Sequence, residues 1–265
     1  MFWLHGEDLP AGVGSERFCT MHLVYIVFFL AATIGYVIFY RKLDKERRKT
    51  ADRITGSLVF FFGLCEYGIT ALVGRFSLYT LPIHVCSLMF SLTLIHAWTN
   101  KARPGSFGAK LHAFLGAVIF HPGFLGTWAA LLFPDWLYYP FWNYLSITGF
   151  MVHGCISLYG ASVMVNDAEA PEPHRLCVLD FLRSAAFMIG GSVIMYFFDK
   201  ATDTDYWFMA GPGNDSPFTG IYESSGYRGY LIAYIATATV ISLLFYGVRF
   251  LIDLRRSRRT SDLSS

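Results

Sequence analysis

The chain has 265 residues, of which 54% are hydrophobic and only 15% are charged. Soluble domains carry about 25% charged residues, so this composition excludes an ordinary soluble protein and indicates an integral membrane protein. The formal net charge of +2 comes mostly from short basic loops, so we expect no nucleic-acid partner.

Seven apolar stretches have the roughly 17 to 25 residues that a helix needs to cross about 30 Å of hydrocarbon. Backbone polar groups in lipid require internal partners, so each stretch is expected to be a helix. The sequence therefore predicts an all-α, polytopic membrane protein, a single seven-transmembrane-helix bundle. The residues before the first stretch lack the pattern of a cleaved signal peptide, so we expect that span to be retained. The expected spans are residues 22–40, 54–73, 82–98, 107–133, 142–165, 176–198 and 228–252.

Lysines and arginines in the loops set the expected orientation. The loop "RKLDKERRKTADR" holds seven of them, and residues 253–265 form a basic tail. The N-terminus is therefore expected outside and the C-terminus in the cytoplasm, with the bilayer as the main partner and anionic lipid headgroups at the cytoplasmic face. We expect a multi-pass protein, of the plasma membrane if the source is bacterial.

The stretch "LPIHVCSLMF", residues 81–90, places a thiol just inside the third span. Pro82 suits the first turn of a helix, so Cys86 is expected near a helix N-terminus, where a thiolate is favoured. Cys86 is the candidate nucleophile. The alternative is a cysteine that packs as a small apolar residue.

Three histidines are candidates for the base that a thiol nucleophile needs. His84 is two residues from Cys86 and would face away from it on a regular helix, so we expect it to bind substrate or to donate to an oxyanion. His153, between apolar neighbours in the fifth span, is the preferred base. His121 precedes a Pro-Gly pair expected to break the fourth span, and it is the competing base. Helix rise places Cys86 roughly 6 Å and His153 roughly 17 Å inside their spans, a mismatch in depth.

Other polar residues gather in the outer half of the predicted bundle. Glu66 in the second span is a candidate to orient a histidine, as the third member of a triad does. The alternative is a protonated carboxyl group that only makes a hydrogen bond. Asn143, at the start of the fifth span, is a candidate oxyanion donor. The five cysteines show no CxxC spacing, so the sequence predicts neither a disulfide framework nor a zinc site, and we expect no cofactor.

The external loop, residues 199–227, is rich in aromatic residues and contains Asp205, Tyr206 and Trp207. Aromatic residues at a membrane interface often anchor a helix end. The interpretation we prefer is a re-entrant lid, because irregular backbone at membrane depth is tolerated where it lines a protein cavity.

Three of these segments resemble the YwaF-like family of bacterial integral membrane proteins and their animal relatives, the transmembrane protein 164 group of seven-span ether-lipid acyltransferases. The segments are "LPIHVCSL", "MVHGCISLYG" and "DTDYWFMAGPGNDSPF", and the resemblance extends over about residues 50–250. It implies an acyl-transfer cysteine at Cys86 and matches His153 to the family's span-five histidine.

The expected function is therefore phospholipid acyl transfer through a Cys86 thioester, with phospholipid and lysophospholipid substrates. The sequence alone leaves two alternative functions open. One is a seven-helix sensor or small-solute transporter without catalysis. The other is a zinc-dependent lipid amidase that would use His84, His121, His153 and Glu66.

Overall fold

A computed structural model describes residues 1–4, 8–99, 103, 105–169, 173–212 and 216–262. The regular structure of these residues is entirely helical, as predicted. Within the described residues, six helices are long and apolar enough to cross a membrane, and a shorter apolar helix covers Val85–Thr99. The main helices are α1 (Thr20–Arg41), α2 (Lys45–Leu72), α3 (Val85–Thr99), α4 (Phe107–Val118), α5 (Phe124–Leu132), α6 (Tyr144–Ala168), α7 (Pro173–Thr202) and α8 (Thr219–Asp262).

The fourth predicted span is continuous, and the break expected at its Pro-Gly pair is absent. The helix passes from α4 to α5 through one turn of π-helix, η3 (Ile119–Gly123), which contains Pro122. A π turn accommodates the hydrogen bond that proline cannot make. Close by, the Ser184 hydroxyl of α7 donates to the Ala117 carbonyl at 2.8 Å, so a neighbouring helix binds backbone at the end of α4.

Several helix boundaries differ from the sequence-based expectation, and α2 already begins at Lys45. Helix α3 begins at Val85 rather than at residue 82, so its 15 residues extend only about 22 Å. Helix α7 continues to Thr202 and α8 begins at Thr219, which shortens the predicted loop before the last helix to residues 203–218. Helix α8 bends at Gly226, where φ is +68°, and its backbone remains helical through most of the predicted tail.

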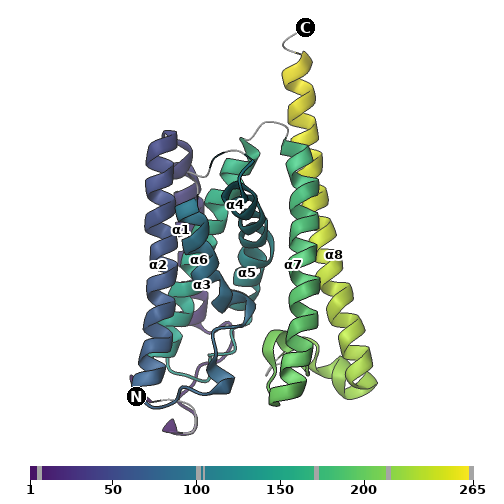
Figure 1. Ribbon diagram of the computed structural model, residues 1–265. Coiled ribbons are helices and arrows are strands. Elements are labelled where there is room, and N and C mark those ends of the chain that lie inside the picture. The colour runs from purple at the N-terminus through teal and green to yellow at the C-terminus, as the bar shows by residue number, and fades with distance from the viewer. Residues whose placement is uncertain (5–7, 100–102, 104, 170–172, 213–215, 263–265) are drawn as a thin grey trace.

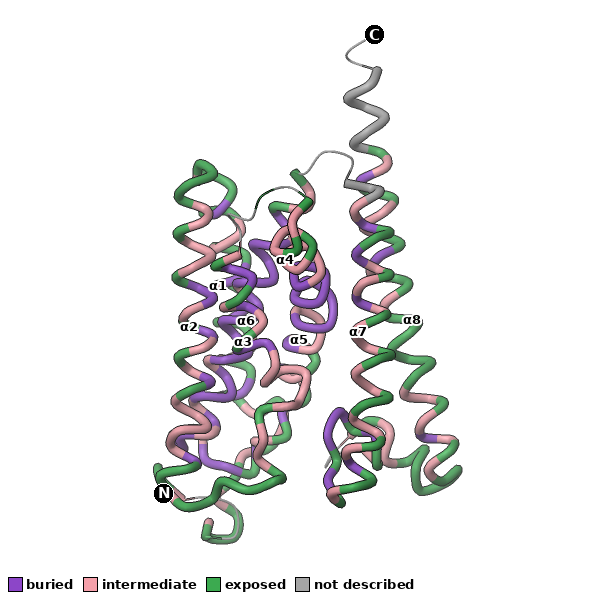
Figure 2. Tube along the Cα trace, viewed as in Figure 1, coloured by how far each residue is buried: buried purple, intermediate pink, exposed green. Residues whose placement is uncertain are grey.

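Helix α6 forms the centre of the bundle formed by α1 to α6 (Figure 1). In the apolar stretch of α6 that is long enough to cross a membrane, 78% of the residues are buried. The corresponding stretch of α8 has 6% buried, and Figure 2 shows the same contrast. Helices α7 and α8 run side by side as a pair, and α7 packs against α4. The apolar faces that α1, α7 and α8 leave exposed are the surfaces expected to face lipid.

Candidate functional site

Cys86 is the second residue of α3, three residues closer to the helix start than the predicted span beginning at residue 82 implied. The first amide groups of a helix lack partners inside it and carry partial positive charge. Both effects favour a thiolate at this position. The side chain is half-buried, so part of its surface remains accessible. The expected location of Cys86 at a helix N-terminus is confirmed.

Two pairs of hydroxyl groups fix the level of Cys86 relative to α2 and α6. The Tyr67 and Ser87 hydroxyls are 2.7 Å apart, which joins α2 to the start of α3. The Thr70 and Tyr144 hydroxyls are 3.2 Å apart, which joins α2 to the start of α6. One turn further along α6, the Thr148 hydroxyl interacts with the carboxyl group of Glu66. Glu66 and Cys86 therefore lie at the same depth in the bundle.

Two carboxyl groups, those of Asp135 and Glu66, lie within electrostatic range of the Cys86 thiol. Asp135 is in the loop between α5 and α6, where no sequence pattern marks it as a functional residue. Its side chain retains exposed surface, yet enough protein surrounds it that desolvation raises the pKa of the Asp135 carboxyl. Negative charge here opposes a thiolate at Cys86, so a base must offset it.

His153 is 8% exposed, and its hydrogen bond defines which ring nitrogen can accept a proton. Its Nδ1 lies 2.7 Å from the Gly149 carbonyl oxygen. A carbonyl only accepts, so Nδ1 carries the hydrogen and Nε2 carries the lone pair. The ring of Trp136, next to Asp135 in the same loop, stacks on the imidazole at a centroid distance of 4.8 Å. His153 thus has the tautomer that a general base needs.

The same hydrogen bond reduces the depth mismatch between His153 and Cys86. Side chains on a helix tilt toward its N-terminus, and the imidazole of His153 reaches back to the turn that contains Gly149. That turn directly follows Thr148, which is level with Glu66 and Cys86. Among the described residues, no hydrogen bond joins Cys86 to His153, so their pairing stays a prediction.

His121, the competing base, lies in η3 and is 7% exposed. Its ring packs on Phe245 and Tyr246 of α8, at centroid distances of 5.8 and 4.9 Å. Neither ring nitrogen has a hydrogen-bond partner within the described residues. His121 therefore faces the α8 side of the bundle, whereas His153 faces the α5–α6 loop.

His84 does not lie on a regular helix, which corrects the geometric argument made from its spacing to Cys86. It belongs to the turn before α3, and its ring lies 4.6 Å from that of Tyr206. Tyr206 and Trp207 belong to the short helical segment η4 (Tyr206–Phe208). The Trp207 indole donates to the Ile83 carbonyl at 2.8 Å, and the Leu81 amide donates to the Tyr206 hydroxyl at 2.8 Å.

Residues 203–208 therefore pack directly against the turn that leads into Cys86. Asp199, at the end of α7, holds this segment by accepting from the Thr204 hydroxyl and the Tyr206 amide, both at 2.9 Å. Asp203, Trp207 and Phe208 have φ between +54° and +58°, a conformation that is unfavourable for such side chains. Strained backbone of this kind is characteristic of functional loops.

Asn143 and Asp205 have structural partners. Asn143 caps α6 by accepting from the Leu145 amide, and its side-chain nitrogen donates to the carbonyls of Met1 and Leu4 at 2.9 and 2.8 Å. Both of its hydrogens are used, so the geometry differs from the expected oxyanion donor. Asp205 accepts from the Ala210 amide at 2.8 Å.

In the described part of the chain, no three His, Cys, Asp or Glu side chains are grouped to hold a metal.

The fold defines a multi-pass integral membrane protein, and its candidate site centres on a half-buried cysteine at the start of a short helix. The model of the TMEM164 family matches residues 17–246, and the chain belongs to that family. This confirms the relationship to the transmembrane protein 164 group that the three segments indicated. Neither the curated proteins nor the solved structures contained a match.

Proposed function

We propose that this protein is a phospholipid acyltransferase in which Cys86 carries the acyl group. The observation that carries the proposal is the position of Cys86: a half-buried thiol in the first turn of α3, level with Glu66 and next to the loop of Asp135 and Trp136. Membership of the TMEM164 family supports a role connected with lipids. The proposal includes the predicted orientation, with the N-terminus and the α3 start on the extracytoplasmic side.

In the first step, the Cys86 thiol gives its proton to Nε2 of His153. The thiolate sulfur attacks the ester carbonyl carbon of a phospholipid, the C–O bond breaks, and the leaving lysophospholipid takes the proton from the imidazolium. In the second step, the hydroxyl of another lysophospholipid gives its proton to His153 and attacks the thioester. The C–S bond breaks, and the thiol recovers its proton.

Three features support His153 as this base. Its Nδ1 hydrogen is held by Gly149, its Nε2 is left to accept, and the stacked Trp136 fixes the ring plane. Glu66, at the level of Cys86, is assigned to stabilise the imidazolium that forms during transfer. The segment of residues 203–208 acts as the lid, because it packs on the turn before α3 and would keep water from the thioester.

The test is labelling of the purified protein by a phospholipid whose acyl chain carries a reporter. Wild type is expected to incorporate the chain in a hydroxylamine-sensitive bond, and Cys86→Ala is expected to lose incorporation entirely. Cys65→Ala is the matched control, because Cys65 is also half-buried and neighbours Glu66 on α2. Unchanged incorporation in Cys86→Ala would overturn the proposal.

A further inference from the structure

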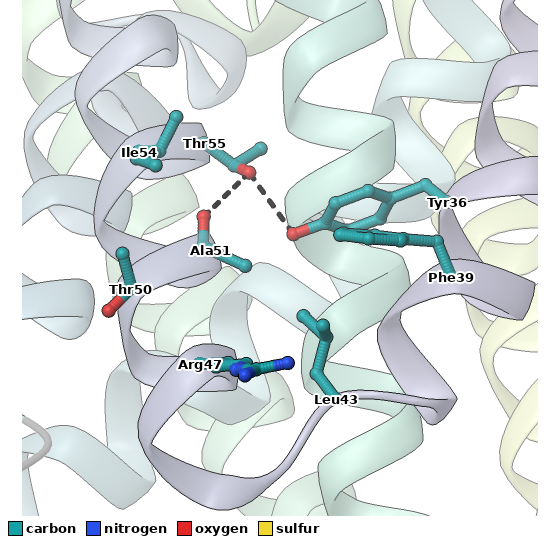
Figure 3. A pocket seen from close by; sticks show the side chains of 8 residues that line it. All are labelled: Tyr36, Phe39, Leu43, Arg47, Thr50, Ala51, Ile54 and Thr55. Atoms are coloured by element: carbon teal, nitrogen blue, oxygen red, sulfur yellow. Dashed lines mark hydrogen bonds between the residues drawn. The ribbon is translucent and has the colours of Figure 1, made fainter.

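The α1–α2 hairpin carries a groove beside the turn between its two helices (Figure 3). Cys86 lies near the other end of α2, because the neighbouring Ser87 contacts Tyr67. Its volume is about 370 Å³, which falls within the roughly 300–1,000 Å³ of small-molecule sites. The walls are apolar: Tyr36 and Phe39 from α1 and Leu43 from the α1–α2 turn face Ala51 and Ile54 from α2. Phe39 and Ile54 are both more than half exposed, so the groove opens toward the lipid-facing surface.

The end of this groove nearest the α1–α2 turn is cationic. Arg47 lines it, and Arg41, Lys42 and Lys45 are exposed in and beside the same turn. Asp44 pairs with Arg47 at 3.3 Å, but both side chains are largely exposed, and such pairs contribute little. An anionic group that approaches Arg47 therefore meets net positive charge.

The inner wall of the groove is held by partly buried hydrogen bonds. The Thr55 hydroxyl donates to the Ala51 carbonyl at 2.8 Å and lies 3.1 Å from the Tyr36 hydroxyl (Figure 3). Just behind this wall, the carboxylate of Asp52 accepts from the hydroxyls of Tyr40 and Ser162, each at 2.8 Å. These bonds join α1, α2 and α6, so the groove keeps its shape without a ligand, which lowers the cost of binding.

The length and polarity of the groove match a lipid rather than a soluble anion. Arg47 and Thr55 are eight residues apart on α2, about 12 Å along the axis. A phosphate at Arg47 would therefore leave its acyl chain to lie along the apolar walls beyond it. A free phosphate would use the cationic end alone and leave those walls exposed.

We propose that this groove binds one anionic phospholipid of the leaflet adjacent to the α1–α2 turn. Its headgroup phosphate pairs with Arg47, and one acyl chain lies between Phe39 and Ile54. The site is distinct from Cys86, and its occupancy does not depend on acyl transfer.

The experiment is native mass spectrometry of the full-length protein with phosphatidylglycerol or phosphatidylcholine added to the detergent. Wild type is expected to retain one phosphatidylglycerol more tightly than phosphatidylcholine. Arg47→Gln is expected to weaken that binding about fivefold, the factor that corresponds to about 1 kcal/mol for one interfacial cation. Ala51→Phe fills the groove without changing charge and is expected to remove the bound lipid.

Lys49→Gln is the matched control. Lys49 is two residues from Arg47 on α2, but its side chain pairs with Glu46 at 2.6 Å and does not line the groove. It is expected to bind like wild type. Any one of three results would overturn the proposal. Lys49→Gln and Arg47→Gln could weaken binding equally, or the two lipids could bind with equal affinity. A folded Ala51→Phe variant could also bind the lipid as fully as wild type. Thermal unfolding of the variants shows whether each is folded. Inorganic phosphate that competes fully with phosphatidylglycerol would show an anion site without a chain, and would also contradict it.

Discussion

The hydroxyl of Tyr67 lies 2.7 Å from that of Ser87, and this contact holds the first turn of α3 against α2. It places Cys86 at the depth of Glu66. Because α3 is too short to span the hydrocarbon alone, the level of its first turn depends on such side-chain contacts rather than on the membrane surface.

Ser87→Ala is therefore expected to loosen the start of α3. It leaves the Tyr67 hydroxyl without its partner, at a cost of about 1–3 kcal/mol to the free energy of unfolding. We expect a lower unfolding temperature together with slower acyl incorporation at Cys86. Tyr79→Phe is the control, since Tyr79 is 66% exposed, and it should change neither quantity. Wild-type labelling and stability in Ser87→Ala would show that the contact does not position the thiol.

His153→Ala and His121→Ala separate the two candidate bases. Loss of a general base typically costs about 10²–10⁴-fold in rate, so His153→Ala is expected to slow thioester formation by at least about 100-fold near neutral pH. Its rate should recover as pH rises, because hydroxide then ionises the thiol. His121→Ala should retain most of the wild-type rate. The reverse result, with the larger loss in His121→Ala, would assign the base to η3.

Asp135→Asn is expected to change how stability depends on pH. Desolvation raises the pKa of Asp135 in the folded protein, so the folded state binds a proton more readily than the unfolded chain does. Stability therefore falls as pH rises from the unfolded pKa through the folded one. Asp135→Asn should unfold at a higher temperature than wild type at pH 8, and this gain should vanish near pH 4. Glu223→Gln, at an exposed position on α8, should show no such pattern.

Gly191 and Gly190 provide a matched pair for testing the lid. A Cβ atom added at Gly191 would approach the Trp207 ring to 2.1 Å, whereas one added at Gly190 would meet nothing within 4 Å. Gly191→Ala should displace Trp207 from the turn before α3 and so reduce labelling of Cys86 by a phospholipid. A small water-soluble thiol reagent should still react, and Gly190→Ala should match wild type in both assays. Equal phospholipid labelling of the two variants would contradict a role for Trp207 in substrate access.

The helices were predictable because hydrocarbon leaves an apolar backbone segment few alternatives. The residue at which α3 begins was harder to predict. Pro82 indicated a helix beginning there, but Trp207 and Tyr206 bind backbone groups of Ile83 and Leu81, which keeps this segment as a turn. These partners lie more than 120 residues away along the chain. No local pattern contains that information.

In the candidate site, too, some features followed from local sequence and others depended on the fold. The position of Cys86 followed from local sequence, and so did the choice of His153 over His121, which still awaits a kinetic test. Asp135 was missed because an acidic residue in a short loop after a span is ordinary. Only the fold brings it within range of Cys86. The Pro-Gly pair indicated the place of an irregularity in the fourth span, but no local pattern distinguished a π turn from the expected break.

The most direct measurement is peptide mass spectrometry of the purified protein after a brief incubation with a single defined phospholipid. The proposed mechanism predicts an adduct equal to the mass of the fatty acid less one water, on the peptide that contains Cys86 and removable by hydroxylamine. An acyl adduct confined to a different residue, or transfer between lipids that continues in Cys86→Ala, would contradict it.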